Sequence, residues 1–169
     1  MARKSRKTWE DAAAELGLTI DQRSRRRRPT EMSGMLEGFE LRIWKSTVSD
    51  TRGTFPTTRW AVDFRAPIGP PGLSIRSGTS RRDEAIRRIG SWTLTASRPH
   101  DLDAWLTTER VAALEAVTAT RGVWEGTVWE GTQDQLTLMI MPIVRKTISR
   151  SRLVAHTKAM LAAANAVSS

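Results

Sequence analysis

Two histidines and the acidic residues near them are the side chains whose types could support acid–base or metal chemistry. His100 is followed by Asp101 and Asp103, so one imidazole and two carboxylates are neighbours in the chain. Three such groups ligate a metal ion only where the backbone folds around it. We favour the alternative that Asp101 caps a short helix and that His100 is a solvated loop residue. His156 lies among basic residues near the end of the chain, where we expect it at the surface.

A pair of glutamates is the other arrangement that could do chemistry. Glu125 and Glu130 each follow a tryptophan in the tandem repeat of residues 123–127 and 128–132. A glycosidase needs two carboxyl groups about 5–10 Å apart across a cleft, whereas five residues of a strand span roughly 16 Å. We therefore interpret these glutamates as solvated charges. The chain has no cysteine, and we expect no catalytic activity, no metal and no cofactor.

The most distinctive feature of the chain is a run of five arginines within six residues. Arginine is rarely buried without a partner, so such a run needs either solvent or an anion. Further basic residues near the end of the chain could extend it into one surface that contacts nucleic-acid phosphates without reading the base sequence. The candidate nucleic-acid-binding residues are Arg23, Arg25, Arg26, Arg27, Arg28, Arg145, Lys146, Arg150 and Arg152.

Length and charge predict one domain of residues 1–169 with a net charge of +9. Basic residues dominate 1–30 and 143–169, and acidic residues dominate 100–142. This asymmetry indicates an anionic partner or contacts between segments of opposite sign. The absence of cysteine fits a reducing cytoplasm, and no apolar window reaches the ~18–20 residues of a membrane helix. We expect a cytoplasmic protein with no transmembrane segment, and contact with a membrane surface is disfavoured.

The beginning of the chain predicts a tail, a helix and a linker. Residues 1–7 are expected to be a basic tail, and the helix covers residues 8–17 with Thr8 as its N-cap. Residues 19–31 lose all periodicity and contain the arginine run, which Pro29 keeps out of a helix. We therefore expect an exposed arginine-rich linker between the first helix and a sheet.

The rest of the chain predicts an antiparallel sheet with helices. Gly38 marks a tight hairpin turn, and the polar residues 46–56 are expected to form a loop. Period-two alternation predicts strands near residues 32–36, 39–44, 60–65, 73–76 (a short edge), 92–96, 123–130 and 135–144. Helices are expected at residues 80–89, 101–106, 107–117 and 149–167. Hairpin-length connections favour the α+β class, with about five to seven strands and the helices mainly on one face.

Residues 105–114, Trp-Leu-Thr-Thr-Glu-Arg-Val-Ala-Ala-Leu, resemble a segment shared by uncharacterised bacterial α+β domains. In those domains a strand is followed by a short acidic turn, by a helix that starts Leu-Thr-x-Glu-Arg, and then by a hairpin and a final helix. The order of elements over residues 92–167 fits this pattern, and residues 34–41 look like the opening hairpin. The resemblance implies an α+β fold and carries no activity with it.

These observations predict a non-enzymatic binding or interaction module, whose partner the sequence does not identify. The alternative is a protein that binds nucleic-acid phosphates through its arginine run and its basic final segment. The two hypotheses differ in the dependence of binding on salt. The oligomeric state stays open, because a sheet edge or the alanine-rich last helix could each mediate self-association.

Overall fold

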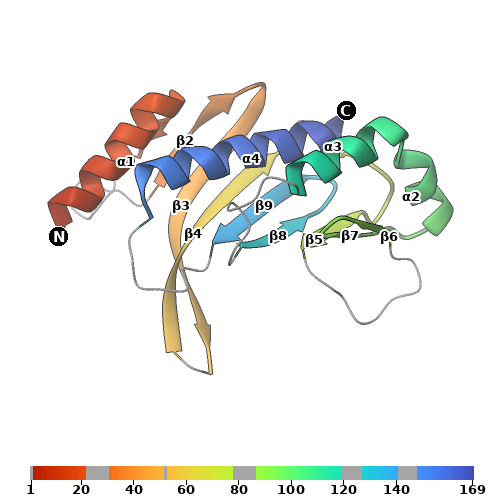
Figure 1. Cartoon of the computed structure of the whole chain (residues 1–169), viewed down its shortest axis with the longest axis horizontal. Coiled ribbons are helices and arrows are strands. Elements are labelled where there is room, and N and C mark those ends of the chain that lie inside the picture. The colour runs from red at the N-terminus through yellow and green to blue at the C-terminus, as the bar shows by residue number, and fades with distance from the viewer. Residues whose placement is uncertain (1, 22–30, 52, 78–86, 119–126, 141–147) are drawn as a thin grey trace.

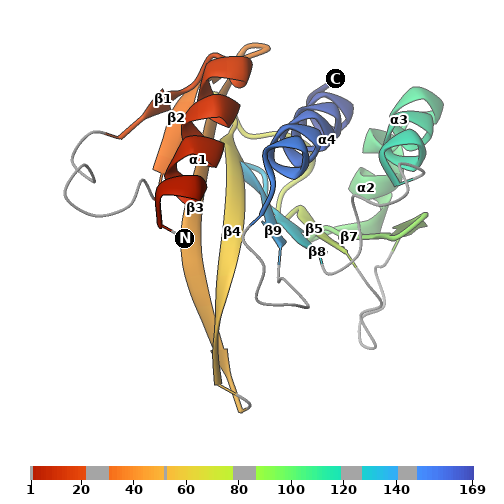
Figure 2. The ribbon, with the colours of Figure 1, turned by 60° about the vertical axis from the view of Figure 1, so that its left-hand side comes forward.

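In the part of the chain that the structure describes, the protein is an α+β fold in which one antiparallel sheet carries four helices on a single face (Figure 1 and Figure 2). It was obtained as a computed structural model, which describes residues 2–21, 31–51, 53–77, 87–118, 127–140 and 148–169. The fold class expected from the sequence is confirmed. The sheet has nine strands, more than expected, because strands of two or three residues are too short to show alternation.

Helices lie at both ends and in the middle of the chain, and strands occupy most of the rest. The helices are α1 (Ala2–Leu16), α2 (Pro99–Trp105), α3 (Thr108–Thr118) and α4 (Arg150–Ser168). The first strands are β1 (Thr19–Ile20), β2 (Glu31–Leu36), β3 (Phe39–Asp50) and β4 (Gly53–Asp63). The remaining strands are β5 (Ser74–Ser77), β6 (Arg87–Ile89), β7 (Trp92–Thr95), β8 (Thr127–Gly131) and β9 (Gln135–Ile140).

The strands follow the order β1-β2-β3-β4-β9-β8-β5-β7-β6 and pair antiparallel throughout. Alternation sets their two faces. In β3, Leu41 and Ile43 are fully buried, whereas Arg42 between them is exposed. Ile43 pairs with Trp60 of β4, so buried side chains continue across neighbouring strands on the same face.

Contacts from each helix identify this face as the covered one. Lys45 Nζ of β3 lies 5.0 Å from the ring centre of Trp9 in α1. Trp60 Nε1 donates a hydrogen bond of 3.0 Å to Thr157 Oγ1 in α4. Further along the sheet, Trp92 of β7 donates to a main-chain oxygen of α3, and Arg87 of β6 bonds to Asp103 of α2. The hydrophobic core therefore lies in one layer between the sheet and the helices.

The turn between β2 and β3 confirms the hairpin expected at Gly38. Glu37 and Gly38 have φ angles of 51° and 87°, the left-handed conformations that a two-residue hairpin turn requires. The polar loop expected at residues 46–56 was wrong. β3 and β4 continue through these residues as a two-stranded ribbon that extends beyond the rest of the sheet (Figure 1). Polar side chains can stabilise such a solvated ribbon by pairing across its strands, as Ser49 Oγ and Thr54 Oγ1 do at 2.9 Å.

The first helix is longer than its sequence pattern indicated. α1 begins at Ala2, so the expected basic tail is helical and Thr8 lies inside the helix instead of capping it. Arg6 pairs with Glu10 one turn later, at 2.7 Å, and no glycine or proline interrupts residues 2–16. Gly17 ends the helix as expected, with φ of 69°. β1 occupies the start of the expected linker, whose residues 22–30 lie outside the described part.

Two expectations in the middle of the chain were wrong. Arg87 and Arg88, placed in a helix over residues 80–89, belong to strand β6, and residues 78–86 lie outside the described part. The order of acidic and basic residues in 80–89 suits the ends of a helix. In the structure, Arg87 instead lies in the edge strand β6 and donates a hydrogen bond to Asp103 of α2. β5 was expected at an edge, yet it lies between β8 and β7.

The last part of the chain follows its sequence signals closely. Thr107 Oγ1 accepts from Arg110 N at 3.2 Å and so caps α3, and Ser149 caps α4 by accepting from Arg152 N at 3.3 Å. The expected hairpin is formed by β8 and β9. Residues 119–126 and 141–147, which include most of the first copy of the repeat, lie outside the described part. No helix among the described residues is long and apolar enough to cross a membrane.

Candidate functional site: a pocket where α2, α3 and α4 meet the end of the sheet

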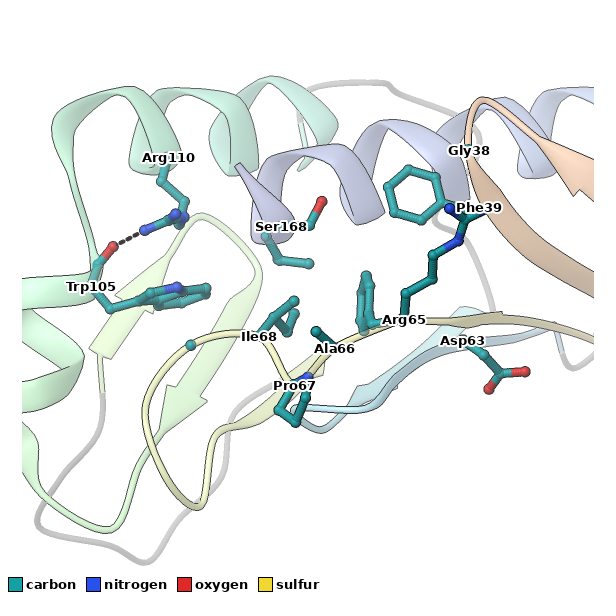
Figure 3. A pocket seen from close by; sticks show the side chains of 13 residues that line it. Gly38, Phe39, Asp63, Arg65, Ala66, Pro67, Ile68, Trp105, Arg110 and Ser168 are labelled. Carbon is teal, nitrogen blue, oxygen red and sulfur yellow. Dashed lines mark hydrogen bonds between the residues drawn. The ribbon is translucent and has the colours of Figure 1, made fainter.

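A pocket of about 430 Å³ opens where the last turn of α4 meets the start of α3 and the loop after β4 (Figure 3). Five separate segments of the chain form its wall. The lining residues are Gly38, Phe39, Asp63, Phe64, Arg65, Ala66, Pro67, Ile68, Gly69, Trp105, Arg110, Val167 and Ser168. Most of these side chains are apolar, and aromatic rings come from three different segments.

The loop after β4 forms the floor of the pocket and is anchored to the β8–β9 turn. Phe64 N donates to Asp134 O and Ile68 N donates to Gln133 O, each at 2.8 Å. The side chain of Gln133 donates in return to Gly69 O at 3.2 Å. Hydrogen bonds at both ends of residues 64–69 therefore tie the floor of the pocket to the β8–β9 turn.

Gly69 brings the loop close to Trp105, the last residue of α2. Its φ is 65°, and a Cβ atom there would lie 2.7 Å from Leu73 Cδ2 and 3.1 Å from Trp105 Cε2. Another residue would therefore have to move Leu73 or the indole that forms one wall. This position needs glycine both for its backbone angle and for the space it leaves.

Arg110, in the first turn of α3, joins three helices at the pocket. Its guanidinium lies over the ring of Trp105, with Cζ 4.6 Å from the ring centre. Nη1 donates to Trp105 O and Nη2 donates to Ser169 O, which are main-chain oxygens at the ends of α2 and α4 (Figure 3). A cation beside the carbonyl ends of two helices is favourably placed.

The surroundings of Arg110 combine burial with its two contacts to main-chain oxygens. Burial lowers the pKa of Arg110, because desolvation disfavours the charged guanidinium. Its Nε atom is buried and has no hydrogen-bond partner among the described residues. None of the ion pairs found in the described part of the chain joins Arg110 to an Asp or Glu side chain.

Arg65 and Asp63 complete the charged groups at the pocket. The exposed Arg65 side chain extends toward the turn that carries Gly38 and Phe39 (Figure 3). Asp63 points away from the other lining side chains, and its Oδ1 accepts a hydrogen bond of 2.5 Å from Gln135 Nε2. The positively charged side chains that line the pocket are therefore Arg65 and Arg110.

The arginines singled out from the sequence lie elsewhere. Arg150 and Arg152 are at the start of α4, far along the helix from the pocket at its end. Arg150 Nη2 pairs with Glu15 Oε2 of α1 at 2.5 Å, and Arg152 is exposed. The other seven candidates, Arg23, Arg25, Arg26, Arg27, Arg28, Arg145 and Lys146, lie outside the described residues. A shared basic surface therefore stays a prediction.

The acidic residues near His100 are not arranged around a common point. His100 lies in α2 instead of a loop, and its Nε2 is 2.7 Å from Asp101 Oδ1. Asp103 is bonded to Arg87 at 2.5 and 2.6 Å. Within the described ranges, no group of three or more His, Asp or Glu side chains could hold a metal ion. Asp101 lies in the first turn of α2, and Arg98 occupies the N-cap position.

His156 was expected at the surface and is instead buried, with 4% of its area exposed. It lies on the sheet-facing side of α4, where its ring stacks on Trp60 at 5.5 Å between ring centres. Its Nδ1 is 2.6 Å from Arg152 O, one turn earlier in the helix. The expectation failed because basic neighbours in sequence lie on other sides of a helix, whereas His156, Met160 and Ala163 share the buried side.

Sequence reasoning did not find the pocket, because its parts are separated by more than 100 residues of chain. Two local signals were available. Trp105 lies outside the regular alternation of the strands, and glycines and prolines gather at residues 67–72. Neither shows that these segments meet.

Comparison of the chain with protein-family models, with curated proteins and with solved structures finds no match. The resemblance of residues 105–114 to uncharacterised bacterial domains therefore stays a prediction. With no relative to suggest a function, a functional proposal rests on the geometry of the pocket and on the charge of the chain.

Proposed function

We propose that this chain is a non-enzymatic binding module that takes the apolar part of a small ligand into the pocket beside Trp105. One observation carries the proposal: aromatic and aliphatic side chains share the pocket wall with polar groups, and its floor is fixed by hydrogen bonds to the β8–β9 turn. Preformed pockets of this size that combine apolar side chains with a few polar groups are typical of small-molecule sites.

The lining residues favour binding over catalysis. They include no histidine, and the only carboxylate among them, Asp63, points away and accepts a hydrogen bond from Gln135. Ser168 has no base beside it, since its hydroxyl donates to Ala164 O at 2.7 Å. General acid–base or nucleophilic catalysis needs a base within hydrogen-bond reach of the reacting group.

Fluorescence of the neutral probe N-phenyl-1-naphthylamine tests this function, because the emission of the probe rises in apolar surroundings. We expect saturable binding to the wild-type protein. Ala66→Trp adds a ring at the pocket and should weaken binding by about tenfold, since the space for the probe is filled. Ala66 is exposed, so the fold should tolerate the change.

Ala155→Trp is the matched control, because Ala155 is exposed on α4 away from the pocket lining. Equal weakening by both substitutions, or no saturable binding to wild type, would contradict the proposed function. Circular dichroism confirms that both variants are folded.

A second candidate is binding of nucleic-acid phosphates, which the run of five arginines and the net charge of +9 favour. Anisotropy of labelled duplex DNA would be compared between wild type and a variant with serine at the five arginines. If all five contact phosphates, the slope of log affinity against log salt is about −4.5 and falls toward zero in the variant. Absence of binding at low salt would exclude this function.

A further inference from the structure

We draw no further inference here: the strongest candidate, the sheet face opposite the helices on which Trp44 of β3 and Arg59 of β4 are cross-strand neighbours, supports no proposal, because nothing in the structure shows what covers it.

Discussion

At the scale of single residues, buried tryptophans connect the helices to the sheet. Trp60 is fully buried, donates to Thr157 and stacks on His156, so one side chain of β4 contacts two buried polar side chains of α4. Trp92 and Trp129 meet edge to face, with 5.0 Å between ring centres. A tryptophan N–H needs a partner when it is buried, which is why Trp60 and Trp92 specify the positions of α4 and α3 and do not only fill space.

Replacing Trp60 with phenylalanine tests this role. The variant loses the hydrogen bond to Thr157 and leaves a cavity, so we expect the free energy of unfolding to fall by about 2 kcal/mol. Urea denaturation followed by circular dichroism measures the loss. Trp44→Phe is the control, because Trp44 is only partly buried on the opposite face of the sheet, and its effect should be about 0.5 kcal/mol. Equal effects of the two substitutions would contradict this role of Trp60.

At the scale of elements, a short strand can be held in the sheet by specific side-chain pairs as well as by main-chain hydrogen bonds to its neighbouring strand. β6 has only three residues, and Arg87 ties it to α2 through two hydrogen bonds to Asp103, at 2.5 and 2.6 Å. The bidentate geometry suits a guanidinium and a carboxylate. The hydrogen bond from Arg87 lowers the pKa of Asp103, so the pair is linked to pH.

The sign of this dependence is set by the direction of the shift. A carboxylate whose pKa is lowered in the folded state adds stability above its ordinary pKa of about 4 and loses it as pH falls through the lowered value. We therefore expect wild type to be more stable than Asp103→Asn at neutral pH, with a difference that shrinks in acid. Urea midpoints measured across the acid range for wild type, Asp103→Asn and Arg87→Gln check this. A difference that does not change with pH would show that Asp103 is not the titrating group.

The individual elements show which structural features local sequence patterns can predict and which they miss. The turn at Gly38, helix starts near residues 107 and 149, and the β8–β9 hairpin were predicted, because each depends on a few neighbouring residues. The solvated ribbon of β3 and β4 was missed, since polar residues on both faces of a ribbon resemble a loop in sequence.

At the scale of the whole molecule, charged segments meet in ways that the net charge does not reveal. The basic first turn of α4 pairs with α1 through Arg150 and Glu15, and Arg87 pairs with Asp103 from the acidic part of the chain. Both ion pairs connect segments distant in sequence and lie at exposed positions, where such pairs contribute little to stability. The single layer between sheet and helices is therefore held mainly by apolar burial.

The sequence by itself determined the α+β class, the antiparallel pairing and most helix ends, because alternation, caps and turns act over a few residues. Only the tertiary structure decided that His156 is buried and that Arg110 meets Trp105 and Ser169 at a pocket. The physical reason is distance along the chain. Burial and pocket shape depend on which remote segments pack together, and no local pattern of residues encodes that choice.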